Sequence, residues 1–568
     1  MCVASRQNYG MGEMGSVSSR GSSSGSLRTA AQWREVLRLR PEAVRAALAE
    51  VYGEWEDLIR ARRAKLVELL DAFAAAFGAD CPMVVARAPG RVNLMGRHVD
   101  HRGGYINTIA IHNDVWITAA ARDDGRLHLR NLDPEFASQN LDPTDLWRAA
   151  EGRSWHDFIE SEAVAGHLAR HRGAWTNYAL GAYLRFRREF GNPVAGGLNA
   201  VFWGDVPRSV GLSSSSAVFV ATAMALARLA GIEVEPDRFI GLCGEGEWFV
   251  GTRGGAGDHA AMIHGRRGMI SQIGFFPIHL ANRASLPDCI EIILCNSRQQ
   301  AQKSREARDL FNARVAAYEI ALAALRQRWP HLTVNVKHLR DVNPAMLGVG
   351  ADRIYEMLKT MPVWMTRKEV ANTLPEQADE IERWFATHGD HEGGYPLRAV
   401  LLFGIAECER SRHALEVLSG GDDARIRRLF GVSHDGDRVT HRRPDGRRVS
   451  WAAEFDDDHL DRLIRLSRSD DPAERERAAL TNQPGAYGCS TPEIDEMVDI
   501  ANAIEGVLGA QLVGAGLGGS IVVLARKGTG EVLRRELESR YYGSRGWESD
   551  VHVFQPVKGA SYLTMNNE

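Results

Sequence analysis

The chain has 568 residues, of which 44% are hydrophobic and 25% are charged, as is typical of a soluble globular protein with a sizeable core. Its formal net charge of −4 gives no indication of nucleic-acid binding, and no apolar run approaches the roughly 20 residues of a membrane span. The first residues lack the apolar stretch of a secretory signal. These properties argue against a membrane-spanning or nucleic-acid-binding protein and favour a cytoplasmic one.

The basic residues and the cysteines limit which anion-binding, disulfide and metal sites the chain can form. There are 62 Arg but only seven Lys, so an anion site in this chain has to rely on Arg, backbone N–H groups or a metal. The seven Cys are scattered and form no CxxC pair. This argues against a disulfide framework or a structural zinc site and favours a reducing cytosol.

The character of the sequence changes several times along the chain. Residues 1–28 are rich in Ser and Gly and are expected to be disordered, whereas leucines and valines at helical spacing predict a helical extension over residues 29–80. From Cys81 onward, strand-like and helix-like segments alternate, which predicts an α/β fold. The stretch 420–482 is charged and poor in apolar residues, so an insertion is expected there, and a helix is expected over residues 492–508.

A glycine- and serine-rich loop, PRSVGLSSSSA at residues 207–217, runs directly into a predicted helix. Helix N-termini expose unpaired N–H groups and the positive end of the helix dipole, so they attract phosphate. Small side chains let the backbone approach phosphate oxygens, and serine hydroxyls can reach phosphate or Mg²⁺. A helix cap with a serine-rich lead-in is the simpler alternative, and no GxxxxGK[ST] motif occurs in the chain.

A second loop, APGRVNLMGRHVDHRGG at residues 88–104, concentrates Arg, His and Asp between two predicted strands. Its HxDH cluster does not match the HExxH metal motif and lacks obvious further ligands, so it indicates a sugar site more than a metal site. Carboxylates and imidazoles both bind sugar hydroxyls. A solvated loop with turn glycines is the alternative.

A third element, GAGLGGS at residues 514–520, satisfies GxGxxG numerically. The dinucleotide-binding fingerprint requires a strand before the glycines and a helix after them, and here the predicted order is inverted. The element therefore predicts a glycine turn packed against a ligand and not a dinucleotide site.

These three elements, in this order, resemble motifs of the GHMP kinases, and among them of the galactokinases. Residues 88–104 are similar to APGRVNLIGEHTDYNxG, residues 207–217 to PxGxGLSSSA, and residues 513–522 to the terminal GGGFGG element. Shorter similarities are WTNY at 175–178, EWFVG at 247–251 with GAGD at 255–258, CSTPEID at 489–495 and KGAS at 558–561. The resemblance covers roughly residues 82–568, apart from the insertion.

The resemblance implies two lobes, at residues 81–290 and 291–568, with the active site between them. It also implies transfer of the γ-phosphoryl group of ATP, with Mg²⁺, to the anomeric hydroxyl of a hexose-like sugar. The implied catalytic residues are Asp258, which takes the hydroxyl proton, and Arg91, which orients the hydroxyl and stabilises charge. The implied ATP-binding residues are Gly211, Leu212, Ser213, Ser214, Ser215 and Ser216. The implied metal ligands are Glu247 and Ser215, with Ser214 as the alternative serine.

The implied sugar-binding residues are Arg97, His98, Asp100, Gly255 and Phe311. Three positions depart from the family pattern: Arg97 stands where galactokinases have a glutamate that faces the C6 hydroxyl, Phe311 replaces a tyrosine, and His259 replaces a glutamine. Because a guanidinium only donates hydrogen bonds and pairs with carboxylate or phosphate, Arg97 suggests a C6-anionic sugar such as galacturonate or glucuronate. If Arg97 instead turns away to solvent, neutral galactose is the expected substrate.

A non-catalytic sensor is a further alternative, because some relatives of galactokinase bind sugar and ATP to regulate partners. The helices before residue 81 and the 420–482 stretch could serve such contacts, although the sequence predicts no particular protein partner. The presence of Arg91, Asp258 and Glu247 favours an enzyme.

Overall fold

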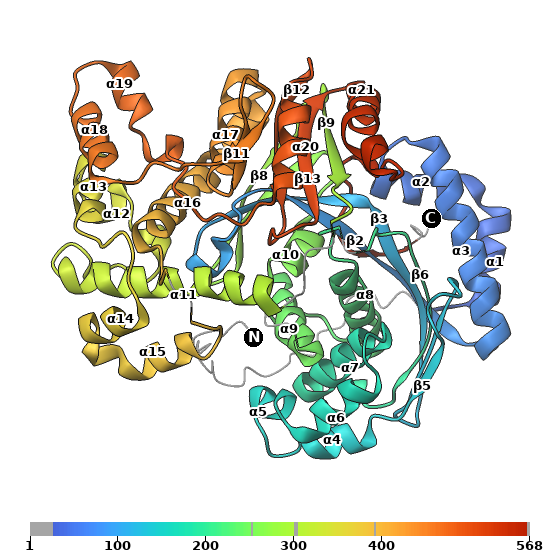
Figure 1. Ribbon diagram of the computed structural model, residues 1–568. Coiled ribbons are helices and arrows are strands. Elements are labelled where there is room, and N and C mark those ends of the chain that lie inside the picture. Colours follow the sequence, from blue (N-terminus) through green and yellow to red (C-terminus); the bar gives the residue numbers. More distant parts are fainter. Residues whose placement is uncertain (1–26, 209, 252–253, 300–304, 391–392, 565–568) are drawn as a thin grey trace.

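The structure is a computed structural model that describes residues 27–208, 210–251, 254–299, 305–390 and 393–564 (Figure 1). Residues 1–26 of the expected disordered tail lie outside the described residues. Strands and helices interleave along the chain, which confirms the expected α/β class.

The first lobe is built on one large sheet. Among the described residues it has nine strands, with the path β1-β2-β3-β6-β4-β5 and with β7, β8 and β15 attached beside it. The two longest strands, β2 (Pro82–Met95) and β3 (Ile106–Ala121), pair antiparallel. The shorter strands are β1 (Arg28–Thr29), β4 (Leu127–Asn131), β5 (Gln139–Leu141), β6 (Leu198–Gly204), β7 (Met269–Gly274), β8 (His279–Ser285) and β15 (Ser561–Tyr562). A register shift between Pro89 and Arg91 marks a bulge in β2, a feature that commonly redirects a side chain near a functional site.

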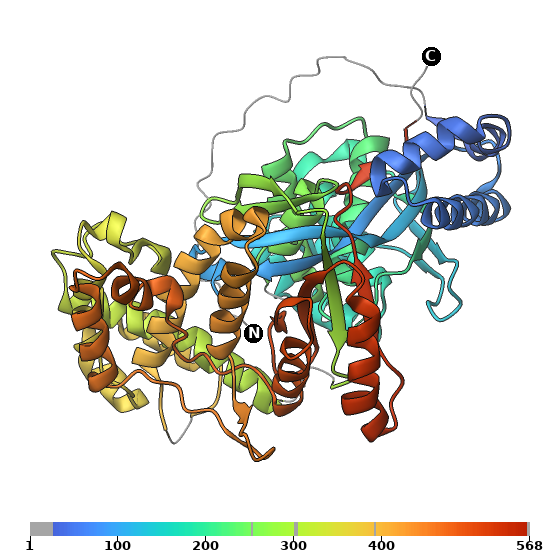
Figure 2. The same cartoon turned by 90° about the horizontal axis from the view of Figure 1, so that it is seen from above.

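Helices cover both faces of this sheet (Figures 1 and 2). Because successive strand residues point to opposite faces, β2 contributes to two cores: Val85 packs with the helices of the N-terminal extension, and Ala86 packs with those of the main body. The extension consists of α1 (Ala30–Leu39), α2 (Pro41–Tyr52) and α3 (Glu56–Phe77). The helices of the main body are α4 (Thr144–Ala150), α5 (Trp155–Ile159), α6 (Glu162–Arg170), α7 (Thr176–Phe190), α8 (Ser214–Leu229), α9 (Pro236–Glu247) and α10 (Gly257–His264).

The second lobe has its own antiparallel sheet in the order β12-β13-β9-β14. Its strands are β9 (Ile290–Asn296), β12 (Val507–Val513), β13 (Ser520–Arg526) and β14 (Val551–Phe554). One face packs against α20 (Pro492–Asn502) and α21 (Gly530–Leu537), and the other contributes to the core that the two lobes share, together with α17 (Asp423–Asp435). The lobes are therefore joined by a continuous apolar interior.

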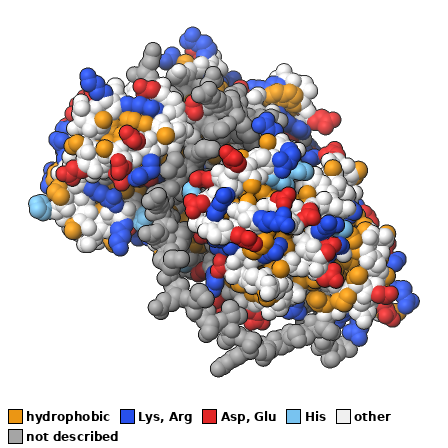
Figure 3. All heavy atoms as spheres, turned by 90° about the horizontal axis from the view of Figure 1, so that it is seen from below, with side chains coloured by type: hydrophobic (Ala, Val, Ile, Leu, Met, Phe, Trp, Pro, Cys, Tyr) orange, Lys and Arg blue, Asp and Glu red, His pale blue; other side chains and the backbone are white. Residues whose placement is uncertain are grey.

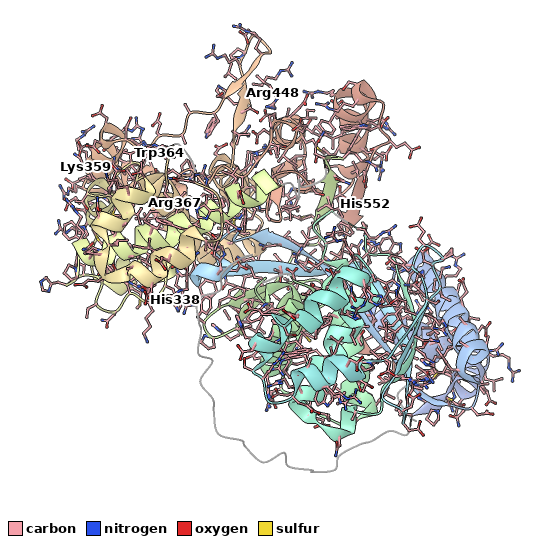
Figure 4. All side chains as sticks on the ribbon, turned by 60° about the horizontal axis from the view of Figure 1, so that its bottom comes forward. His338, Lys359, Trp364, Arg367, Arg448 and His552 are labelled. Atoms are coloured by element: carbon pink, nitrogen blue, oxygen red, sulfur yellow. The ribbon has the colours of Figure 1, made fainter. Side chains whose placement is uncertain are left out.

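A helical part with a separate core extends from the second lobe (Figures 1 and 2). It consists of α11 (Arg305–Arg328), α12 (Pro344–Leu347), α13 (Ala351–Lys359), α14 (Arg367–Thr373), α15 (Ala378–Phe385), α16 (Leu397–Gly420), α18 (Asp457–Ser467) and α19 (Pro472–Arg477). The hairpin β10 (Thr440–Arg442) and β11 (Arg448–Ser450) projects from the body, with Arg448 marking it in Figure 4.

The stretch 420–482 is not a peripheral insertion along its whole length. Ile426, Leu429 and Phe430 of α17 are buried in the core between the lobes, and Asp437, just after this helix, is fully buried. Charged residues along the exposed face of α17 lower the apparent hydrophobicity of the sequence, which explains why the composition alone suggested an addition.

Among the described residues, no helix is both long and apolar enough to cross a membrane. On the face seen in Figure 3, acidic and basic side chains are interspersed, in keeping with the small formal net charge.

Candidate active site

The Gly/Ser loop connects β6 to the first turn of α8 and places small residues at the start of that helix. Gly211 and Ser213 both adopt left-handed backbone conformations, with φ of 84° and 58°, which turn the chain into the helix at Ser214. Gly211 is exposed, whereas Ser216 is buried. Because the first N–H groups of a helix lack intrahelical partners, the start of α8 is suited to bind an anion.

Arg91 and Asp258 meet beside this loop. Arg91 Nη2 and Nε both lie 2.7 Å from Asp258 Oδ1, and Arg91 Nη1 donates to the carbonyl oxygen of Gly211. The Ser213 hydroxyl donates to Asp258 Oδ2. The bulge in β2, the first turn of α10 and the start of α8 thus place the three groups in one hydrogen-bonded cluster.

The Asp258 carboxyl group is held as an anion. Burial alone raises its pKa, but the Arg91 guanidinium and the Ser213 hydroxyl outweigh burial, so the pKa lies below its usual range. The side chain nevertheless keeps 35% of its surface exposed. It can therefore receive a hydrogen bond from a hydroxyl group that enters the site.

Glu247, at the end of α9, lies on the other side of the serine loop. Ser216 Oγ donates to Glu247 Oε2 at 2.7 Å, and His259 Nε2 lies 2.8 Å from the same oxygen. The expected serine partner, Ser215, instead bonds to Tyr178. Of the serines in this turn of α8, Ser216 is therefore the one that bonds to Glu247.

The side chains around Glu247 fit Mg²⁺ in the company of nucleotide phosphates. Among the residues that the structure describes, no cluster of three or more His, Cys, Asp or Glu side chains could hold a metal ion. Magnesium in phosphoryl-transfer sites is commonly held by one or two carboxylates together with substrate phosphates. The Glu247 carboxylate and a neighbouring serine hydroxyl match that donor set.

The third glycine-rich element packs against the serine loop. It joins β12 to β13, and Ser520 Oγ donates to the carbonyl oxygen of Val210 at 3.0 Å. A methyl group on Gly516, which has φ of 82°, would lie 2.2 Å from the Cys489 carbonyl oxygen, so only glycine fits this turn. A strand precedes the turn where a helix was expected, because α20 ends at Asn502. No helix follows the glycines directly, so the dinucleotide fingerprint remains excluded.

The loop after β2 (residues 96–104), which the sequence predicts to bind the sugar acceptor and which we call the acceptor loop, lies against the loop before α10. A methyl group on Gly255 would lie 3.3 Å from Asp100 Oδ2, so the loop before α10 lies against this carboxylate. Asp100 is 34% exposed and pairs with His101 Nδ1 at 3.1 Å. Burial raises the pKa of Asp100. The hydrogen bond to His101 and the charge interaction with its ring have the opposite and larger effect, so the pKa of Asp100 lies below its usual range. The ring of Phe311, on α11, lies 6.2 Å from that of His98.

Arg97 does not point into the acceptor side, in contrast to the expectation for a C6-anion site. Its side chain is 2% exposed, and its Nη2 lies 3.1 Å from Asp437 Oδ2 and donates to the Ser433 carbonyl oxygen at 2.9 Å. Its Nη1 donates to Gln511 Oε1. The alternative expectation, that Arg97 turns to solvent, is also wrong, because the guanidinium is buried and neutralised within the protein.

Sequence reasoning missed the residues behind this loop. His98 Nε2 lies 3.4 Å from Asp437 Oδ1, and the His98 ring stacks on Tyr487 at 4.3 Å between centroids. Glu407 Oε1 accepts hydrogen bonds from the backbone N–H groups of Gly96 and Arg97 at 3.2 and 3.3 Å. Glu407, which follows the apolar run LLFGIA, carried a signal of burial, whereas Asp437 lies in the charged stretch GVSHDGDRVTHRR and carried none.

Comparisons with known proteins find family models that match three parts of the chain. They match residues 177–266 as the GHMP kinases N terminal domain, residues 71–121 as the galactokinase galactose-binding signature, and residues 459–543 as GHMP kinases C terminal. GHMP kinase models thus match segments of both lobes. The third match begins inside the stretch that was expected to be an insertion.

The chain is also similar to galactokinases over most of its length. It is 26% identical over 501 residues to a galactokinase of Roseiflexus sp. (strain RS-1), which covers 88% of this chain and 97% of that protein. It is 21% identical over 539 residues to a galactokinase of Dictyostelium discoideum, which covers 91% of this chain and 97% of that protein. Lactococcus lactis galactokinase complexed with galactose matches with a TM-score of 0.58 and 18% identity, covering 86% of this chain and 98% of that one, and shows the two-lobed fold. The protein is a phosphotransferase with an alcohol group as acceptor.

Proposed function

We propose that this protein is an ATP-dependent sugar kinase that phosphorylates the anomeric hydroxyl of a neutral hexose, with galactose as the first candidate, to give a sugar 1-phosphate. The observation that carries the proposal is the Arg91–Asp258 pair beside the start of α8. It combines a carboxylate that can accept a proton, a fixed cation and a helix end that attracts phosphate. The similarity to galactokinases supports the sugar as acceptor.

Asp258 and Arg91 divide the chemistry between them. Asp258 accepts the proton of the acceptor hydroxyl as that oxygen bonds to the γ-phosphorus and the bond to the bridging oxygen of ADP breaks. Arg91 stabilises the negative charge on the transferring group, and its bond to the Gly211 carbonyl oxygen fixes it beside the phosphates. The lowered pKa of Asp258 keeps the carboxylate ready at neutral pH.

The serine loop and Glu247 hold the donor. The residues from Gly211 to Ser216 would cradle the phosphates of ATP through backbone N–H groups and hydroxyls. Glu247 and the adjacent Ser216 would hold Mg²⁺, which supplies charge neutralisation on the phosphates when it is bound.

The environment of Arg97 supports a neutral acceptor over a uronic acid. A guanidinium that is already paired with Asp437 and bonded to two further oxygens has little capacity left for a substrate carboxylate. Drawing Arg97 toward a uronic acid would leave Asp437 buried without its cation, at a cost of about 3–5 kcal/mol.

Coupled ADP release across neutral, acidic and amino sugars tests this function. We expect a neutral hexose to be turned over faster than galacturonate or glucuronate. Preference for a uronic acid would contradict the neutral substrate. Binding of sugar and ATP without ADP release from any sugar would contradict the enzyme and support the sensor.

An Asp258→Asn variant tests the assigned base in the same assay. We expect kcat to fall by about 10²–10⁴, the range for loss of a positioned acid–base group, while the protein remains folded. Asp237→Asn, in the exposed first turn of α9, is the matched control and should retain kcat. An equal loss of kcat in both variants would show that Asp258 is not the base.

A further inference from the structure

The buried carboxylate of Asp437 binds two consecutive residues of the acceptor loop. Arg97 Nε and Nη2 both lie 3.1 Å from its Oδ2, and His98 Nε2 lies 3.4 Å from its Oδ1. The backbone N–H of Cys489 donates to Oδ1 at 3.3 Å. All three side chains are at most 3% exposed, so water screens this group of charges very little.

Arg97 and His98 form a turn directly after β2. In this turn the backbone of His98 adopts φ of 59°, in the left-handed region that non-glycine residues seldom occupy. Such a conformation costs about 1–3 kcal/mol and persists where surrounding contacts enforce it. Asp437 on one edge of the ring and Tyr487 stacked on its face are those contacts.

The strained residue sits directly before the exposed part of the acceptor loop. Asp100, two residues later, is 34% exposed and lies against Gly255 and the loop that leads to Asp258. A change in the backbone at His98 would therefore be transmitted to Asp100, while the serine loop on the donor side has no contact with Asp437 among the described residues.

We propose that Asp437 is a positioning residue for the sugar: by lying against His98 Nε2 and neutralising Arg97, it fixes the loop of residues 96–100 in the shape that binds the acceptor. This inference rests on the proposed function, since it takes the acceptor loop to bind a sugar. Arg97 then helps Asp437 to fix the loop and does not itself contact the substrate.

Two paired substitutions separate positioning from a purely structural role. Arg97→Met with Asp437→Leu replaces the buried ion pair by apolar side chains of similar size, a change that often leaves stability intact. Arg97→Gln with Asp437→Asn also removes both charges but keeps a polar side chain of the same size beside His98 Nε2 and the Cys489 N–H. Single substitutions are less informative, because each leaves an unpaired buried charge.

We expect the Met/Leu pair to keep a melting temperature near that of the unmodified protein and to raise the sugar KM roughly tenfold or more, the effect of losing one hydrogen bond in the binding loop. The ATP KM should not change. The Gln/Asn pair should keep the sugar KM within about threefold. If sugar KM follows the melting temperature in both pairs, or the Met/Leu pair binds sugar normally, the proposal is wrong.

Arg398→Met is the matched control, because Arg398 is a buried arginine (6% exposed) paired with Asp457 in the helical part. It should lower the melting temperature and leave both KM values unchanged. Sugar affinity measured by calorimetry provides a readout without turnover. If no sugar yields ADP but the Met/Leu pair still weakens sugar binding, the proposed function fails while Asp437 keeps its role.

Discussion

Two groups of mostly buried charged side chains differ in what they hold. The extension-side cluster comprises Tyr52, Arg62, Arg87, Asp114 and Asp205, on the face of the first sheet that packs against the N-terminal helices. Asp114 accepts from Arg87 Nε at 2.8 Å and from the Tyr52 hydroxyl, and Arg62 Nη2 donates to Asp205 at 2.7 Å. The cluster thereby ties α2 and α3 of the N-terminal extension to β2, β3 and the residue that follows β6.

The acceptor-side cluster comprises Arg97, Glu407, Arg410 and Asp437. Glu407 pairs with Arg410 at 2.8 Å and also accepts from the backbone N–H groups of Gly96 and Arg97. The carboxylates of this cluster therefore hold the backbone and side chains of the loop after β2, whereas the extension-side carboxylates mainly join structural elements. The comparison implies that damage to the first cluster lowers stability, and that damage to the second also lowers affinity for the acceptor.

The largest expected effect is on stability, from Asp114→Asn. Asp114 is fully buried beside Arg87 and Arg62, so the substitution leaves two buried guanidinium groups with too little negative charge. We expect a loss of about 3–5 kcal/mol in the free energy of unfolding, measured by urea denaturation, with normal KM values in the folded fraction. A loss below about 1 kcal/mol, or a selective change in sugar KM, would break the distinction between the clusters.

Glu407→Gln is expected to combine a smaller loss of stability with a loss of sugar affinity. The amide keeps an oxygen for the Gly96 N–H but leaves Arg410, which is fully buried, without its counter-charge. We expect a loss of about 2–3 kcal/mol and a sugar Kd that rises several-fold, measured by denaturation and calorimetry. An unchanged Kd would mean that Glu407 supports only the fold.

Tyr52→Phe tests how strongly the N-terminal helices are fastened to the catalytic sheet. Removal of the hydroxyl deprives Asp114 of one donor, which should lower the free energy of unfolding by about 1–2 kcal/mol without altering kcat or either KM. Tyr562→Phe, whose hydroxyl bonds to the Met224 carbonyl oxygen on the opposite face, is the matched control for loss of a tyrosine hydrogen bond. A fall in kcat with Tyr52→Phe alone would give the extension a functional role.

The smallest effect concerns pH. The pKa of Asp437 in one cluster is lowered and that of Asp205 in the other is raised, so their contributions to stability change with pH in opposite directions. Burial raises the pKa of Asp437, but the charges of His98 and Arg97 outweigh it, so the pKa falls well below its usual range. Burial raises the pKa of Asp205, and the nearby Asp114 adds to this, although Arg62 opposes it. Stability from Asp437 is therefore present above about pH 4 and is lost as pH falls, whereas the burial cost of ionised Asp205 develops as pH rises above about 4.

This difference is measurable by urea denaturation between pH 3 and 7. Relative to the unmodified protein, the stability of Asp205→Asn should improve as pH rises from about 4, and that of the Arg97→Gln/Asp437→Asn pair should improve as pH falls below about 4. Parallel changes in the two variants would show that the clusters titrate alike.

The sequence could predict the chemistry that lies within motifs, but not the partners that come from distant elements. Arg91 and Asp258 were expected together because both lie in recognisable motifs, although 167 residues separate them. Arg97 was misjudged because its partner Asp437 is 340 residues away, in a stretch whose charged composition hides a buried helix. The helix predicted over residues 492–508 ends at Asn502, and the strand at Val507–Val513 was not predicted, because a short apolar run cannot be assigned by periodicity alone.

The return of residues 557–563 to the first sheet has a consequence for how the protein is made. β15 pairs with Arg87 and Ala86 of β2, and Arg87 Nη1 donates to the Gly559 carbonyl oxygen across 472 residues of chain. At a ribosomal rate of about 5–20 residues per second, roughly 25–95 s pass between the synthesis of Arg87 and that of Gly559. The lobe that holds Arg91 thus reaches its final form only after residues 557–563 have been synthesised, and until then β2 lacks its partner β15.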